Sequence, residues 1–330
     1  MLKKKIVDAF LFGGEKDIFC ARINYLKNSV NYFLAIESNS TFTGNKKDLT
    51  LKNIINLNFP DIKDRIFVYE NKQKILNIKD LIRINYYPFK KDSPNIKTIL
   101  RKYKEQKVKS YIALNEGFQR ELINHAIKKL HLKESDILLI SDLDEIPSKT
   151  FIKKASIIEK DFIFYAHMNQ YLFNTEFSLK EKWIGTVALR SNLLKTNSVH
   201  NLRFMLKEFN KKTLPYKLIP NSGWHLTSFG NIKQIQKKIS SWGHQELNTI
   251  INRNLLRYRV RRGFDIFSRN KIIKFEKTNR DIPSNIRKFF NKEDYFINYI
   301  KPNLFDKIFN FIASLLDKII RKISLYFQKI

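Results

Sequence analysis

The sequence Asp136-Ile-Leu-Leu-Ile-Ser-Asp142-Leu-Asp144-Glu145-Ile-Pro147 joins a short apolar run to a group of acidic residues. The run is typical of a buried strand, because it is short, rich in Ile and Leu, and bounded by polar residues. Asp142 and Asp144 are two positions apart, so both carboxylates can point to one side as the chain leaves the sheet. In open α/β sheets, ligands bind beyond the carboxyl ends of the strands. The stretch therefore predicts a sheet strand that ends at a ligand site.

Short apolar runs and helical patterns alternate through the rest of the first half. The patterns predict strands at Ile6–Phe12, Tyr32–Ile36, Arg65–Tyr69 and Asp136–Ser141, and helices at Lys16–Lys27, Leu49–Asn58 and Asn115–Leu130. This alternation favours a parallel, doubly wound α/β sheet. The lysine-rich segment Ile75–Val108 is poorly periodic, and we interpret it as a helix-containing insertion.

The predicted strands after Pro147 are richer in aromatic residues. Aromatic-rich patterns predict further strands at Phe162–Phe173, Trp183–Arg190 and Tyr216–Ile219, followed by helices at Ile232–Ile239 and Glu246–Arg257. No linker separates the two halves, so we expect them to share one sheet.

Composition limits the class of protein. Of the 330 residues, 43% are hydrophobic and 13% aromatic, which is enough to fill a core and excludes a disordered chain. Nine glycines and eight prolines exclude a collagen-like chain. The single cysteine, Cys20, excludes an internal disulfide and a cysteine-based zinc site. The formal net charge is +31, so nucleic acid or an anionic membrane is a conceivable partner.

Neither end of the chain predicts a secretory or membrane-spanning segment. The apolar run after Met1–Lys5 is short and contains Asp8, unlike a signal peptide. The longest uncharged apolar stretch near the C-terminus, Ile308–Leu316, has nine residues, whereas a spanning helix needs about 20. We therefore expect a cytoplasmic protein.

Several ordered motifs carry a resemblance to a known family. They are Asp8-Ala-Phe, Glu15 with Asp17, Glu37-Ser38-Asn39, Ser141-Asp142-Leu143-Asp144-Glu145-Ile146-Pro147 and Gly223-Trp224-His225. In this order and spacing the chain resembles glycosyltransferase family 17, the β-1,4-mannosyl-glycoprotein N-acetylglucosaminyltransferases, from about residue 5 to about residue 265. It lacks the N-terminal membrane anchor of the animal members, and Leu-Thr-Ser-Phe replaces a cysteine-containing segment after Gly-Trp-His. Both departures indicate a cytoplasmic, bacterial relative.

The resemblance implies a GT-A-like nucleotide-sugar fold and an inverting, metal-dependent glycosyltransferase. We expect one domain over residues 1–300, with a donor-binding half over about 1–147 and an acceptor half over about 148–300. The expected donor is a nucleotide sugar, by family default UDP-N-acetylglucosamine. The expected acceptor is a glycan hydroxyl, for example on a lipid-linked or lipopolysaccharide glycan.

The two strand-end aspartates are the predicted metal ligands. Asp142 and Asp144 offer hard oxygen donors of the kind that Mg²⁺ or Mn²⁺ prefers, with substrate phosphates and water completing the shell. Neutral imidazole is a suitable third donor, so His225 is either a ligand or a structural histidine.

Other residues of the first half are candidates for donor binding, Asp142 among them. Asp8, which we place at the end of the first strand, would bind the base or ribose, or would cap a turn. Glu37 and Ser38 end the second strand and offer the same two roles. Arg120, on the helix before the Asp136–Ser141 strand, would neutralise diphosphate charge or remain a surface charge.

An inverting transfer needs a base for the acceptor hydroxyl proton. Glu246, in Ser241-Trp-Gly-His-Gln-Glu246, is one candidate, although a carboxylate at a helix N-terminus has the same pattern. Glu145 is the other candidate.

The segment 301–330 predicts an amphipathic basic helix. Apolar residues recur at helical spacing from Leu304, and residues such as Asp306, Asn310 and Lys322 mostly occupy the other face. The helix either docks on the domain or lies on an anionic membrane, which would make the protein peripheral on the inner face of the cytoplasmic membrane.

Two other functional classes compete with the enzyme. A basic nucleic-acid-binding protein would explain the charge of +31 and the run Arg257–Arg262, but the charge is spread along the chain without a recognised reader motif. A catalytically inactive membrane-associated scaffold would not need the two strand-end aspartates. We therefore expect an enzyme and no nucleic-acid partner.

Overall fold

The structure is a computed structural model that describes residues 4–84, 88–90, 95–97, 99–100, 110–208, 214–269, 271, 273–277 and 281–327. The chain forms two compact units. Unit 1 comprises residues 1–168 and 184–223, and unit 2 comprises residues 169–183 and 224–330. The single domain expected over residues 1–300 stays a prediction.

The core of unit 1 is a mixed sheet with neighbouring strands in the order β3-β2-β1-β4-β7. The first four strands are parallel: β3 (Ile66–Asn71), β2 (Tyr32–Ser38), β1 (Ile6–Phe12) and β4 (Ile137–Asp142). All four were predicted from the sequence. However, β7 (Phe177–Arg190) runs antiparallel to β4 in unit 1, so the expectation of a parallel sheet holds only in part.

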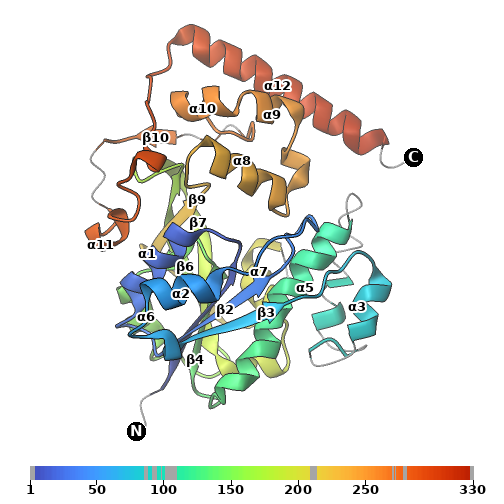
Figure 1. The fold of residues 1–330 in the computed structure, drawn as a ribbon, viewed down its shortest axis with the longest axis vertical. Coiled ribbons are helices and arrows are strands. Elements are labelled where there is room, and N and C mark those ends of the chain that lie inside the picture. Colours follow the sequence, from blue (N-terminus) through green and yellow to red (C-terminus); the bar gives the residue numbers. More distant parts are fainter. Residues whose placement is uncertain are drawn as a thin grey trace. The chain divides into compact units, whose positions relative to one another are not determined.

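Helices cover both faces of this parallel part (Figure 1). On one face, Phe10 and Phe12 of β1 contact Phe19 of α1 (Lys16–Leu26). On the other face, Val7 and Ala9 of β1 share a core with α5 (Ser110–Ala126) and α7 (Val199–Glu208). Successive strand residues point to opposite faces, which is why the two sets alternate along β1. The doubly wound arrangement was predicted correctly.

The remaining elements of unit 1 are short. They are α2 (Leu51–Asn58), α3 (Ile78–Ile84), β5 (Glu145–Pro147), α6 (Lys149–Ala155), β8 (Tyr216–Ile219) and the first part of β6 (Ile163–Leu172). Much of the predicted insertion Ile75–Val108 lies outside the described residues, and α3 is a helix within it.

Unit 2 contains parts of two strands that it shares with unit 1, two further short strands and a group of helices. Its strands are the last part of β6, the first part of β7, β10 (Ile273–Phe275) and β9 (Gly223–Thr227), of which β9 begins at the last residue of unit 1. Its helices are α8 (Ile232–Ser241), α9 (Ile250–Asn254), α10 (Leu256–Arg262), α11 (Ser284–Arg287) and α12 (Leu304–Phe327). The single helix predicted at Glu246–Arg257 is wrong, because Leu255 separates α9 from α10.

The core of unit 2 is aromatic and aliphatic. Phe173 and Phe177 pack with Ile235 of α8 and with Leu256 and Val260 of α10. The predicted C-terminal helix is present as α12. Within the described part of the chain, none of the helices has both the length and the hydropathy needed to span a bilayer.

Candidate active site

The strand-end aspartates lie at the turn between β4 and β5. Leu138, Ile140 and Asp142 share one face of β4 because their positions differ by two, and this face is covered by α5 and α7. Ser141 points to the opposite face, toward α1. The end of one strand therefore serves two different clusters of side chains, one on each face of the sheet.

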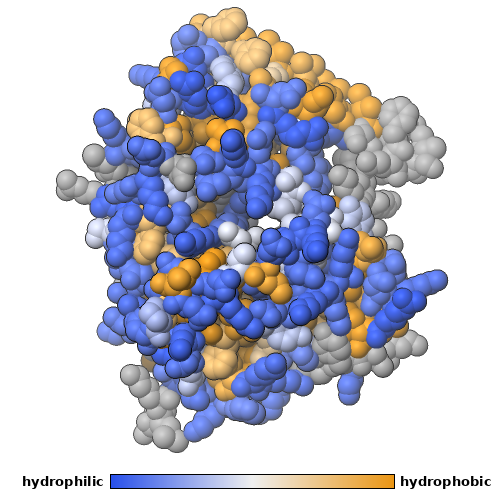
Figure 2. Space-filling view, in the orientation of Figure 1, coloured by the Kyte–Doolittle hydropathy of each residue, from blue (hydrophilic) through white to orange (hydrophobic). Residues whose placement is uncertain are grey.

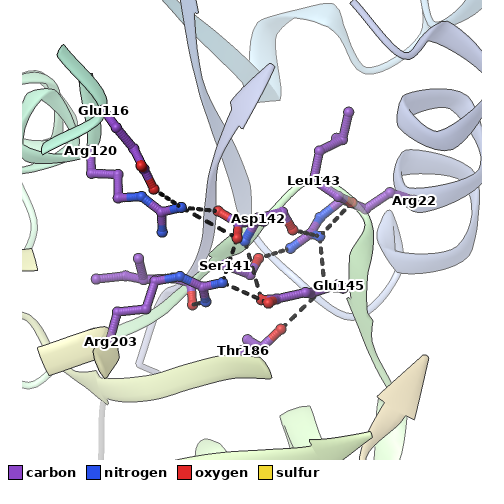
Figure 3. Close-up of polar contacts among 10 residues, drawn as sticks. Arg22, Glu116, Arg120, Ser141, Asp142, Leu143, Glu145, Thr186 and Arg203 are labelled. Atoms are coloured by element: carbon purple, nitrogen blue, oxygen red, sulfur yellow. Dashed lines mark hydrogen bonds and ion pairs between the residues drawn. The ribbon is translucent and has the colours of Figure 1, made fainter. Parts of the chain in front are cut away.

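Two arginines converge on Asp142 from the helices of its own face (Figure 3). A nitrogen of Arg203, on α7, lies 2.8 Å from Asp142 Oδ2, and a nitrogen of Arg120, on α5, lies 3.2 Å from Oδ1. Arg120 also pairs with Glu116 at 3.1 Å. The Asp142 side chain remains 33% exposed, whereas both arginines are buried. The carboxylate is thus the accessible member of a cluster of ion pairs.

Glu145 lies deeper than Asp142 in the same cluster. Its side chain is fully buried, Oε1 lies 2.6 Å from a nitrogen of Arg203, and Oε2 accepts a hydrogen bond from the backbone N–H of Asp142. Burial by itself would lower the pKa of Arg203, but the carboxylates of Asp142 and Glu145 more than offset burial and raise that pKa above its ordinary value. Arg203 therefore remains a cation inside the protein.

On the α1 face, Arg22 fixes the turn. Its guanidinium pairs with both carboxylate oxygens of Asp8, at 2.6 and 2.8 Å. It also donates to the backbone carbonyls of Asp142, Leu143 and Glu145 at 2.8 to 3.1 Å. Arg22 and Asp8 are both fully buried. Arg22 thereby provides hydrogen-bond donors for three backbone carbonyls of the turn.

The predicted donor-binding acids have other partners in the structure. Asp8 is the third residue of β1, so its placement at the strand end is wrong, and it pairs with Arg22. Glu37 is buried and accepts from the backbone N–H groups of Thr50 and Leu51, at the start of α2. These contacts give both acids structural roles, and their contact with a donor stays a prediction.

The other sequence candidates are placed as follows. Ser38 is the last residue of β2, as predicted, and accepts from the Asn71 side chain at 3.1 Å. His225 lies in unit 2 and stacks on Trp183, with ring centroids 4.6 Å apart. Glu246 is an exposed residue of unit 2, and its Oε1 lies 2.9 Å from His244 Nδ1. The two candidate bases, Glu145 and Glu246, belong to different units, and neither assignment is tested.

Comparison with known proteins places this chemistry in a family. The model of glycosyltransferase family 17 matches residues 1–91 and 79–282. The chain belongs to glycosyltransferase family 17. Among curated proteins, none matches this chain.

Solved structures similar to this family 17 chain are distant. HddC from Yersinia pseudotuberculosis has 10% sequence identity and a TM-score of 0.34, over 67% of this chain and 91% of HddC. Its complex with GMP-PN has a TM-score of 0.31 over the same shares of both chains, again at 10% identity. The inositol-1-phosphate CTP transferase from T. maritima has 10% identity and a TM-score of 0.30, over 88% of this chain and 95% of that protein.

The acids of the family 17 motif fit one kind of metal site. Asp142 is partly exposed and Asp144 is 8% exposed, and a pair of carboxylates is a usual protein contribution to a Mg²⁺ site that substrate phosphates complete. Among the described residues, no group of three or more His, Cys, Asp or Glu side chains that could hold a metal occurs. Asp142 and Asp144 are therefore the residues that would hold such a metal.

Two arginines at the end of β4, Arg22 on one face of the sheet and Arg203 on the other, were not predicted from the sequence. Arg22 and Arg203 look like ordinary surface charges in a lysine-rich chain. Each has apolar residues three or four positions away on the same helix face, Phe19 and Leu26 around Arg22 and Val199 and Leu206 around Arg203. An arginine within the buried stripe of a helix must meet a partner, and this signal could have identified both.

Proposed function

We propose that this family 17 protein is an inverting glycosyltransferase that moves a sugar from a nucleotide-sugar donor to a hydroxyl of a glycan acceptor. The observation that carries the proposal is the family match together with the Asp142 cluster at the carboxyl end of β4. N-acetylglucosamine and a UDP-linked donor are the family default.

In this proposal the donor diphosphate binds at the exposed edge of the Asp142 cluster. Asp142 and Asp144 would hold Mn²⁺ or Mg²⁺, and the metal would supply positive charge that neutralises the diphosphate of the leaving group. Arg120 lies beside Asp142, and its planar guanidinium suits bidentate contact with phosphate oxygens. Arg203, between Asp142 and Glu145, holds the two carboxylates in place. His225 remains the proposed third ligand, and Asp8, Glu37 and Ser38 remain proposed donor-side residues.

Glu145 and Glu246 are the two candidates for the general base. The Glu145 side chain is fully buried, and its oxygens contact Arg203 and the backbone of Asp142, whereas the Asp142 carboxylate is 33% exposed. This burial favours a positioning role for Glu145. Glu246 is exposed, and His244 beside it could share or relay a proton. We therefore propose Glu246 as the base. Glu246→Gln should lower turnover by roughly 10² to 10⁴ with little change in donor affinity, and Glu145→Gln should not reproduce this pattern.

Location and acceptor complete the proposal. We propose a cytoplasmic protein that is peripheral on the inner face of a membrane, where a lipid-linked or lipopolysaccharide glycan would supply the acceptor hydroxyl. The basic helix α12 is the surface that would make this contact.

A donor screen tests the proposed function. The melting temperature of the full chain would be measured with UDP-, GDP- and CMP-sugars, each with Mn²⁺ and with EDTA. Binding to the native state raises stability by RT ln(1 + [L]/Kd), about 2.7 kcal/mol at a hundredfold excess over Kd. We expect one nucleotide class to raise the melting temperature, and only when the metal is present.

Variants link the response to the site. Asp142→Asn and Asp144→Asn should each abolish metal-dependent nucleotide stabilisation and transfer. Asp61→Asn, which changes an exposed carboxylate elsewhere in unit 1, is the matched control and should respond like the wild type. A full response by the Asp142 and Asp144 variants, or in EDTA, would contradict the proposed metal site.

A further inference from the structure

Helix α12 is attached to unit 2 through its polar side. Asp306, Ser314 and Asp317 are buried, at 5%, 3% and 0% exposure, and Asn310 is half-buried between them. These positions recur every three or four residues and share one face of the helix. Amphipathic helices normally bury the apolar face in their own domain, so the orientation of α12 is inverted.

Contacts on the polar side are specific. Arg259 of α10, which is fully buried, donates to the side-chain oxygens of Asn310 at 3.0 Å and Ser314 at 3.4 Å. Asp317 pairs with Arg321 at 2.7 Å and accepts a hydrogen bond from Thr249. Charged and hydrogen-bonded groups buried in this way tolerate little rotation or sliding of the helix.

Further contacts hold the first turn of α12. The Tyr258 hydroxyl donates to Asp306 Oδ1 at 2.9 Å, and Arg262 pairs with Asp306 at 3.3 Å. The contacts at Asp306, Asn310, Ser314 and Asp317 together fix which face of α12 points away from α9 and α10.

That outward face is apolar along its whole described length (Figure 2). Its side chains are 39% to 75% exposed, and they are Leu304, Phe305, Ile308, Phe309, Phe311, Ile312, Leu315, Leu316, Ile319, Ile320 and Ile323. Soluble monomers rarely expose a continuous apolar surface of this kind, and such a patch usually marks a binding surface.

The acidic and basic residues of α12 also lie on different sides of the helix. Both acids, Asp306 and Asp317, lie on the buried side and are paired with arginines. The lysines lie outside it: Lys307 and Lys322 are exposed and Lys318 is half-buried. At 3.6 residues per turn, Lys307 and Lys318 fall along one margin of the apolar face, and Lys322 lies near its C-terminal end. The outward side therefore combines apolar surface with positive charge alone.

The width of the face distinguishes a bilayer from a helical partner. A coiled-coil seam uses two positions in seven, whereas α12 exposes apolar residues at eleven of the twenty positions from 304 to 323. A broad apolar face with aromatic residues and lysines at its edge is the pattern of a helix that lies in a membrane interface. The net charge of +31 complements an anionic surface.

We infer that α12 is a preformed membrane-binding face: the buried polar contacts hold its apolar side outward, and this side enters the headgroup region of an anionic bilayer while the helix stays attached to α9 and α10. The inference gives a definite surface and orientation to the proposed membrane contact. It does not depend on the donor or on the reaction, because binding requires neither.

The experiment is co-sedimentation of the full chain with vesicles of phosphatidylcholine alone or with 30% phosphatidylglycerol, at low and high salt. We expect binding to the anionic vesicles that weakens as salt rises. Ile312→Glu and Leu315→Glu, both on the outward face, should each reduce the partition coefficient at least tenfold. Leu57→Glu replaces a leucine that is 80% exposed on α2, and it should bind like the wild type.

A second pair of variants separates α12 from the general charge of the chain. Lys318→Gln with Lys322→Gln should reduce binding by about fivefold per lysine. Lys63→Gln with Lys79→Gln changes the net charge equally at exposed positions of unit 1, and it should have little effect. Metal-dependent nucleotide stabilisation, measured on every variant, reports separately on the proposed function.

Three results would overturn the inference. One is vesicle binding by the Ile312→Glu and Leu315→Glu variants equal to that of the wild type. Another is an equal loss from the two lysine pairs, which would mean adsorption by net charge. The third is a wild-type dimer in light scattering that either glutamate variant converts to monomer with vesicle binding unchanged, which would identify the face as a contact between two copies of the chain.

Discussion

Arg22 donates hydrogen bonds to three backbone carbonyls of the turn after β4. It joins the Asp8 carboxylate to three backbone carbonyls that surround Asp144. Breaking a buried ion pair by removing one partner costs about 3–5 kcal/mol, because the other charge is left buried. The positions of Asp142 and Asp144 therefore depend on Arg22, which belongs to helix α1.

We expect Arg22→Ala to lower the free energy of unfolding by about 3–5 kcal/mol. Arg22→Lys should recover little of this loss, since an ammonium group cannot reach Asp8 and three carbonyls at once. Urea unfolding measures the change, and Lys16→Ala, at an exposed position of the same helix, is the control. A decrease of less than about 1 kcal/mol in the free energy of unfolding of Arg22→Ala would show that the turn keeps its conformation without Arg22.

Glu121 is a buried acid of α5 outside the Asp142 cluster. It accepts from the backbone N–H groups of Val199 and His200, at the start of α7, and from the Asn95 side chain. Burial raises the pKa of Glu121 from 4.5 to about 7, although these hydrogen bonds act in the opposite direction. The folded protein therefore binds this proton more tightly than the unfolded chain does.

The sign of the pH dependence follows from that difference. The contribution of Glu121 to stability is fully present below pH 4.5 and is lost as the pH rises through about 7. Relative to the wild type, Glu121→Gln should therefore gain on the order of 3 kcal/mol between pH 4.5 and pH 8. Urea unfolding of both proteins across this range provides the measurement. Parallel stability profiles would show that the Glu121 proton is not linked to folding.

At the scale of elements, short apolar runs located β1 to β4 because strands covered on both faces are mostly apolar, although β1 also contains the buried Asp8. Sequence periodicity does not report direction, so the antiparallel pairing of β4 with β7 could not be read from it. The same limit applies to α12. Its period gave the two faces correctly, but which face packs inward depends on partners such as Arg259, far away in the sequence.

Strand β9 begins at Gly223, close to the backbone of β5. Gly223 has φ of +139°, and a Cβ atom there would lie 2.2 Å from the carbonyl oxygen of Ile146 and 2.9 Å from Cα of Pro147. These contacts are with backbone, which cannot rotate away as a side chain can. The glycine of the Gly-Trp-His motif is therefore required by close approach as well as by φ.

Gly223→Ala should destabilise the protein by at least about 2 kcal/mol, because it combines an unfavourable φ with a backbone clash. The shift of β5 should also weaken metal-dependent nucleotide binding, since Asp144 directly precedes this strand. Thermal shift with and without nucleotide measures both effects. Gly14→Ala, also at positive φ but with nothing near its Cβ, separates the strain from the clash and should cost less.

At the scale of the whole molecule, the chain forms two compact units. The Asp142 cluster and its arginines lie entirely in unit 1, and α12 with its polar contacts lies entirely in unit 2. Docking and membrane binding were alternatives for α12 when only its sequence was considered. They are compatible in the structure, because α12 docks through Asp306, Asn310, Ser314 and Asp317 and leaves its apolar face exposed.

A chain that ends at residue 303 separates these roles. It would remove the Asn310 and Ser314 partners of buried Arg259 and the Asp306 partner of Tyr258 and Arg262. We expect unit 2 to lose about 3–5 kcal/mol and to exchange its amide hydrogens faster over α9 and α10. Unit 1 should keep its amide protection and its metal-dependent nucleotide stabilisation, because Arg120 and Arg203, which contact Asp142, belong to unit 1. Loss of nucleotide stabilisation together with protection over β1 and β4 would show instead that unit 1 does not fold without α12.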